Sequence, residues 1–151
     1  MLEKKIFLSI SGIQRSPDGQ NNNIELITEG RLYKKGNCTY IEYEESEISG
    51  MEGVKTLIVI DGERVSLERS GSFQTQFVFE KGKKFVNFYS TPFGSLEMAV
   101  YPIKVDSDIR DNEGKLDLKY QLDIGGKYAS SNELLVNYTD SYKSSRLQKN
   151  C

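Results

Sequence analysis

Apolar and polar side chains alternate along most of this chain with a period of two residues. The clearest case is the segment 115–124, where Leu116, Leu118 and Leu122 alternate with Asp117 and Lys119. Successive side chains of a β-strand point to opposite faces, so this alternation gives a strand one apolar face and one solvent-exposed polar face. This pattern is typical of antiparallel sheets with one buried face, and it differs from the 3.6-residue period of an amphipathic helix.

Turn signals separate these alternating runs about every ten residues. The segments 16–19 and 91–94 have Pro second and Gly fourth, which fits a type I turn, and Asp61-Gly62 is a strong hairpin signal. Pro102 cannot donate to a ladder, so a bulge or an edge is expected there. A weak helical candidate, 129–135, is interpreted as a loop entering a strand, and 106–114 as a charged loop. The predicted strands are 4–14, 24–34, 38–45, 54–60, 64–69, 73–80, 84–90, 95–105, 115–124 and 133–138.

Consecutive strands joined by short turns predict an up-and-down meander. So many strands either split into two sheets or curl until their edges meet, because open edges invite aggregation. We predict an all-β fold, an antiparallel up-and-down β-barrel of about 8–10 strands, with a sandwich as the alternative. The 151 residues suit one domain, over residues 1–140, followed by a polar tail over 141–151.

Composition narrows the classes of function. The 20 basic and 22 acidic residues give a net charge of −2, so neither nucleic acid nor a membrane is an expected partner. The chain has no histidine, which excludes Ser-His-Asp and Cys-His triads. Cys38 and Cys151 are too far apart for a zinc motif. The segment 106–111 begins like a calcium-binding loop, but Arg110 occupies the fifth position, where an oxygen ligand is needed. We therefore expect no metal, no cofactor and no enzymatic activity.

The expected compartment is the cytoplasm. The apolar stretch after Lys4-Lys5 is too short for a secretory signal, and no run approaches the length of a membrane helix. In that compartment both cysteines are expected to be reduced.

Several stretches taken together carry a family resemblance. They are Tyr-Ile-Glu-Tyr-Glu-Glu-Ser at 40–46, Arg-Ser-Gly at 69–71, Gln-Phe at 76–77 and Tyr-Ser-Thr-Pro-Phe-Gly at 89–94. In order and separation they resemble the YwiB-like family of bacterial β-barrel proteins, over roughly residues 3–140. The resemblance implies a calycin-like barrel, related in architecture to lipocalins and fatty-acid-binding proteins, and it implies no activity. The chain has no tryptophan, so the Gly-x-Trp motif of lipocalins is absent.

Arg69 is the most informative polar residue, because it follows Val65 and Leu67 on the face expected to point inward. A buried guanidinium needs acceptors, and Glu44 or a tyrosine hydroxyl would serve. Arg69 then either plugs one end of the barrel and ties strands together, or binds the carboxylate or phosphate of a ligand. Further polar contacts are expected from Tyr43, Tyr89, Thr91 and Gln76, although parity places Gln76 on the outside.

Acidic and aromatic side chains supply two more candidate features. Glu42 and Glu44 share a strand face and lie about 6–7 Å apart. They are either a catalytic carboxylate pair or part of a solvated surface that continues into an acidic loop ending at Glu52. The aromatic residues either fill the barrel or line a ligand cage. They are Phe73, Phe77, Phe79, Phe85, Tyr89 and Tyr120.

Three hypotheses follow. The first is a non-enzymatic binding module that holds a small anionic or amphipathic ligand. The second is a structural or interaction domain with a solid core, whose acidic loop at 42–52 meets a basic partner. The third is an enzyme that works through carboxylates.

Overall fold

The structure, a computed structural model, describes residues 3–45, 52–71 and 74–140. Within these ranges the chain forms ten β-strands and no helix, as the two-residue pattern predicts. Residues 141–151, most of the predicted acidic loop and Phe73 lie outside the described residues. The strands are β1 (Glu3–Arg15), β2 (Asn21–Lys35), β3 (Cys38–Glu44), β4 (Val54–Asp61), β5 (Arg64–Gly71), β6 (Thr75–Glu80), β7 (Phe85–Thr91), β8 (Gly94–Ile109), β9 (Glu113–Ile124) and β10 (Lys127–Thr139).

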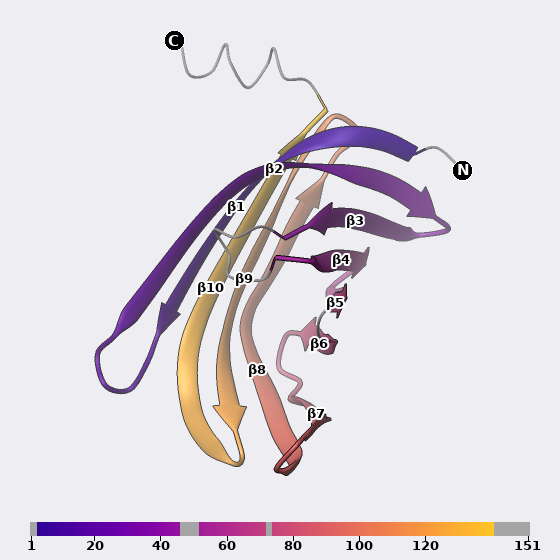
Figure 1. Cartoon of the computed structure of the whole chain (residues 1–151). Helices are drawn as coiled ribbons and strands as arrows, with labels where there is room; N and C mark the ends of the chain where they lie inside the picture. Colours follow the sequence, from indigo (N-terminus) through magenta and orange to yellow (C-terminus); the bar gives the residue numbers. More distant parts are fainter. Residues whose placement is uncertain (1–2, 46–51, 72–73, 141–151) are drawn as a thin grey trace.

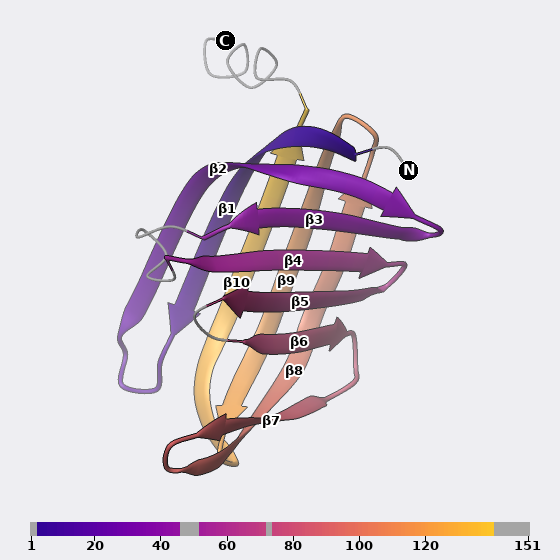
Figure 2. The ribbon, with the colours of Figure 1, turned by 45° about the vertical axis from the view of Figure 1, so that its right-hand side comes forward.

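All ten strands belong to one antiparallel sheet with the order β6-β5-β4-β3-β2-β1-β10-β9-β8-β7. Except for β6 and β7, strands that are neighbours in sequence pair with each other. β1 also pairs with β10, from Phe7 opposite Thr139 to Arg15 opposite Ser131. The sheet curls into a nearly closed barrel in which β3 to β6 cross over β8 to β10, and the long, curved β1 and β2 join the two walls (Figures 1 and 2). The predicted barrel is confirmed in preference to the sandwich.

The barrel is left open along one seam, between β6 and β7. These strands are the two ends of the sheet order, and an isolated bridge between Glu80 and Lys83 is the backbone pairing that links their ends. Figure 2 shows β7 diverging from β6 beyond this point. The sequence predicted a hairpin here like the others, and that prediction is wrong.

Inward-facing side chains are tightly packed toward one end of the barrel. Ile6 and Leu8 of β1 are 0% and 1% exposed, and Leu116 and Leu118 of β9 are 1% and 0% exposed. Ile41 and Ile58 of β3 and β4 are fully buried in the same cluster. The predicted inward direction of Leu116 and Leu118 is therefore confirmed.

Toward the other end, near the β7–β8 and β9–β10 turns, the same faces are only partly buried. On β9 the inward series continues from Leu118 to Tyr120 and Leu122, which retain accessible surface. On β10 the change occurs between Val136, which is buried, and Leu134, which is not fully buried. We call this region the half-packed end.

Several predicted boundaries are corrected. The charged loop predicted at 106–114 is shorter, because β8 runs to Ile109 and β9 begins at Glu113. The segment 129–135 is strand throughout, within β10. The predicted irregularity at Pro102 is confirmed as a register shift between Pro102 and Lys104. Among the described residues no helix is long and apolar enough to span a bilayer.

Candidate functional site

β5 carries Arg69 on its inner face, after the buried Val65 and Leu67, as the parity predicted. The positive charge of Arg69 acts on the hydroxyls of Tyr43 in β3 and Tyr120 in β9. Because β9 belongs to the opposite wall, the guanidinium reaches into the interior. It lies where the packed core passes into the half-packed end.

Two polar atoms at this position are buried without hydrogen-bond partners among the described residues. They are Nε of Arg69 and Oγ1 of Thr75, which belong to directly opposed residues of β5 and β6. None of the ion pairs between described residues includes Arg69. Buried polar groups are rarely left unpaired in folded proteins, so these two atoms mark a place where a ligand or water can form hydrogen bonds.

The two tyrosines beside Arg69 are neutral hydroxyls at ordinary pH. Burial raises the pKa of Tyr43, the negative charge of Glu45 adds to that rise, and Arg69 opposes it. Burial also raises the pKa of Tyr120, again against the effect of Arg69. Neither side chain can therefore neutralise the guanidinium, although each can donate a hydrogen bond to an anion.

The acidic residue that enters the interior is Glu45. It is 8% exposed, its carboxylate accepts a hydrogen bond from Thr56 Oγ1 at 3.0 Å, and its negative charge contributes to the raised pKa of Tyr43. Glu45 belongs to the predicted strand 38–45 and to the acidic run, but its place in the interior was not predicted. The signal was present, since Glu45 is two residues beyond Tyr43 and so continues the inner face of β3.

Two predicted site residues are not brought to Arg69. Glu44 is exposed on the outer face at the end of β3, between the inward Tyr43 and Glu45. Thr91 ends β7 and serves the turn that follows. Its hydroxyl donates to the Gly94 carbonyl at 2.6 Å and accepts from the Phe93 amide at 3.1 Å.

Tyr89 bridges the open seam. Its hydroxyl donates to the Gln76 carbonyl at 2.7 Å and accepts from the Gln76 amide at 3.0 Å, so a side chain of β7 takes the place of a ladder contact to β6. A groove of about 460 Å³ extends across β3 to β6 and reaches the seam at Asn87 and Tyr89 of β7. Its lining includes outward residues such as Glu68 and the inward Arg69, Thr75 and Tyr89, so the groove leads from the surface to the position of Arg69.

Aromatic rings form a row along the inner face of β6 and the strands beside it. Tyr89 meets Phe77 edge-on at 6.4 Å between centroids, Phe77 meets Phe79 at 6.5 Å, and Phe79 meets Tyr120 at 4.8 Å. Tyr89 lines the groove with Arg69, and Tyr120 lies within its electrostatic reach. The Tyr89 end of the row therefore shares the groove with Arg69.

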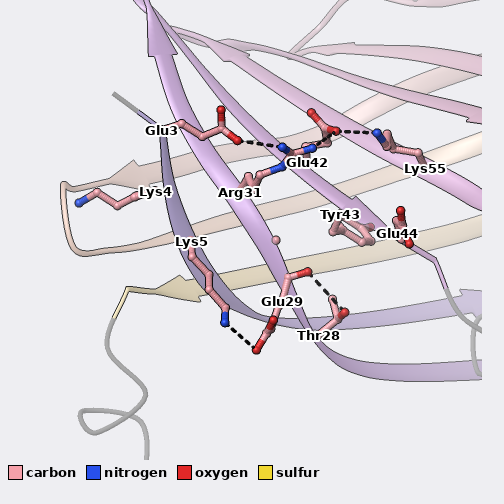
Figure 3. A pocket seen from close by; sticks show the side chains of 11 residues that line it. Glu3, Lys4, Lys5, Thr28, Glu29, Arg31, Glu42, Tyr43, Glu44 and Lys55 are labelled. Atoms are coloured by element: carbon pink, nitrogen blue, oxygen red, sulfur yellow. Dashed lines mark hydrogen bonds and ion pairs between the residues drawn. The ribbon is translucent and has the colours of Figure 1, made fainter. Parts of the chain in front are cut away.

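The outer face of β1 to β4 carries a ladder of ion pairs (Figure 3). Arg31 contacts Glu3 at 3.0 Å and Glu42 at 3.1 Å, and Glu42 also contacts Lys55 at 2.9 Å, beside a groove of about 560 Å³. The hydrogen bond from Lys55 lowers the pKa of Glu42, and the charge of Arg31 adds to this effect. A carboxyl group held ionised in this way is a poor general acid, and its charge is already matched within the sheet.

The calcium-like segment 106–111 is mostly strand and not loop, because residues 106–109 belong to β8. Over the described ranges, no group of three or more His, Cys, Asp or Glu side chains is placed to hold a metal ion.

Comparison with known proteins gives consistent matches. The model of a family described as Domain of unknown function (DUF1934) matches residues 8–136. The chain is 27% identical over 121 residues to the uncharacterized beta-barrel protein YwiB of Bacillus subtilis (strain 168), covering 80% of this chain and 84% of that protein. The crystal structure of the ywiB protein from Bacillus subtilis superposes with a TM-score of 0.79 and 25% identity, over 92% of this chain and 93% of the other.

Proposed function

Because the chain belongs to the DUF1934 family, a domain of unknown function, we propose a function from the site itself. We propose that the protein is a non-enzymatic binding module. Its barrel interior holds the anionic group of a small ligand at Arg69. The observation that carries this proposal is the buried, unpartnered Nε of Arg69 beside the unpartnered hydroxyl of Thr75.

The physical argument concerns the free energy of the unliganded barrel. A buried donor without an acceptor costs about 1–3 kcal/mol, and more when it is charged. An oxygen of a ligand carboxylate or phosphate would accept from Nε, and the planar guanidinium can hold two such oxygens side by side. Binding would then remove a penalty that the empty protein carries.

Access also supports a ligand. The groove along the seam leads from the surface to Arg69, and the inward side chains of the half-packed end keep accessible surface. Tyr120 belongs to this partly buried set, and its burial raises its pKa.

We also propose the type of barrel, the bacterial origin and the cytoplasmic location of the protein. The ten-strand up-and-down order closed through β1 and β10 supports a calycin-like barrel. The Bacillus relative supports a bacterial origin, and the free thiol of Cys38 suits the reducing cytoplasm.

Native mass spectrometry of the full chain purified from cells tests the proposal. We expect a small-molecule adduct on the wild type and on Arg64→Met, which changes an exposed arginine of the same strand. Arg69→Met should lose the adduct. Bare wild-type protein in repeated preparations, or an adduct that survives Arg69→Met, would contradict the proposal.

A further inference from the structure

We propose that the ligand held at Arg69 is a monocarboxylate with an aromatic body. This inference rests on the proposed function and names its ligand class. It follows from three properties of the site, namely its charge, the shape of its donors and the character of its walls.

The charge of the site suits one negative charge and not two. Two cations line the groove at the seam, Arg69 and Lys55, and Lys55 is already paired with Glu42 at 2.9 Å. Glu45 adds a buried negative charge that acts on Tyr43, as Arg69 also does. A phosphate dianion would therefore leave excess negative charge in a poorly solvated interior, which is costly.

The donors of the site suit a planar carboxylate. The Nε–H of Arg69 and the adjacent Nη–H point in parallel from one plane, and they match the two oxygens of a carboxylate. The Thr75 hydroxyl is paired across the strands with Arg69 and is likewise unsatisfied. The hydroxyls of Tyr43 and Tyr120, whose pKa values are raised by burial, are within the range of the charge of Arg69 and are neutral, so they do not compete with a ligand as anions.

The walls suit a ring. The row Tyr89–Phe77–Phe79–Tyr120 begins at Tyr89, which lines the groove with Arg69, and its centroid separations lie between 4.8 and 6.5 Å. Aromatic rings prefer edge-to-face or offset contacts with other rings, and such pairs are favourable beyond the area that they bury. A flat aromatic body whose carboxylate meets Arg69 would extend this row.

The test is calorimetric titration of the full chain with four probes: 2-naphthoate, its neutral amide 2-naphthamide, decanoate and inorganic phosphate. We expect 2-naphthoate to bind the wild type at least about tenfold more tightly than each of the others, the size of one charge-assisted contact. Arg69→Met should weaken 2-naphthoate at least about tenfold and leave 2-naphthamide unchanged. Arg64→Met is the matched control and should bind like the wild type.

The outcomes separate this inference from the proposed function. If phosphate or decanoate binds as tightly as 2-naphthoate and depends on Arg69, the ligand class is wrong and the anion site stands. If no probe depends on Arg69, the inference is wrong and the proposed function loses its support. If circular dichroism shows that Arg69→Met does not fold, Arg69→Lys is the second variant, because it keeps the charge but loses the planar fork. It should lower the affinity for 2-naphthoate severalfold, and unchanged binding would overturn the inference.

Discussion

Arg69 places a guanidinium beside side chains that offer its Nε no acceptor among the described residues. In the ligand-free protein this arrangement should not contribute stability. Methionine has a similar length and removes the unpaired donor. We therefore expect Arg69→Met to leave the free energy of unfolding unchanged or to raise it by about 1–2 kcal/mol, measured by urea denaturation.

If Arg69 is instead a plug that ties strands together, Arg69→Met should lower the free energy of unfolding. Removing one member of a satisfied buried pair costs about 3–5 kcal/mol. Arg64→Met, at an exposed position of β5, should change stability by less than about 0.5 kcal/mol and calibrates the comparison. A loss of several kcal/mol confined to Arg69→Met would favour the plug.

Gly114 lies directly opposite Tyr138, and the tyrosine ring covers it so closely that an added Cβ would overlap ring atoms. The ring is also fixed by its hydroxyl, which donates to the Arg110 carbonyl at 2.6 Å. Gly114→Ala should therefore lower the free energy of unfolding by about 1–3 kcal/mol, the usual cost of overpacking. Gly12→Ala is the control, since nothing lies within 4 Å of its added Cβ, and it should be neutral or slightly stabilising in thermal denaturation.

At the residue scale, parity predicted part of the candidate site. It placed Arg69 inward and Gln76 outward, as the structure has them. The expectation that Glu44 meets Arg69 was wrong, because parity along the strand places Glu44 on the face opposite Tyr43. The unpartnered state of Arg69 could not be predicted, because it depends on which strands the fold brings across the interior.

At the scale of elements, the seam between β6 and β7 depends on one side chain. The Tyr89 hydroxyl makes both hydrogen bonds to the Gln76 backbone, at 2.7 and 3.0 Å. Tyr89→Phe keeps the ring contact with Phe77 but removes these bonds, and it should lower the free energy of unfolding by about 1–2 kcal/mol. Hydrogen exchange at the Gln76 amide should become faster, because that amide loses its acceptor.

Tyr101→Phe is the control for the seam. Tyr101 lies on β8, where its ring faces Lys84 Nζ at 5.4 Å, a contact that phenylalanine retains. We expect neither stability nor exchange at Gln76 to change in this variant. Equal behaviour of Tyr89→Phe and Tyr101→Phe would show that the seam is held by other contacts.

The sequence predicted the elements better than their connections. Alternation and turn residues were sufficient for ten strands in the right order, because both are local properties. The 81–83 turn resembles the other hairpin turns in composition, so nothing local indicated that β6 and β7 would separate. The extra length of β8 and β9 was missed because Asp106 and Asp108 are polar, although each is paired with a residue of β9 in the ladder.

At the scale of the whole molecule, the described tyrosines link global stability to alkaline pH. Burial raises the pKa of Tyr138 to about 12, helped by the nearby charges of Asp111 and Asp108. The unfolded chain releases this proton near pH 10, before the folded chain does. Stability due to this group is therefore complete below about pH 10 and is lost as the pH rises toward 12.

Tyr138→Phe should flatten the fall in stability between about pH 10 and 12, measured as urea midpoints across that range. Some slope should remain, because burial also raises the pKa of Tyr43. A pH dependence identical to that of the wild type would show that Tyr138 titrates in the folded state as it does in the unfolded chain.

The pairing of β1 with β10 has a consequence for the speed of folding. Every other ladder joins strands that are neighbours along the chain, whereas this one must bring Phe7 opposite Thr139. Short loops close quickly and long ones at a larger entropic cost, so hairpins should form early and the ring should close late. The two arches, β1 to β6 and β7 to β10, would then exist as partly formed hairpins before they meet, and that meeting would set the refolding rate.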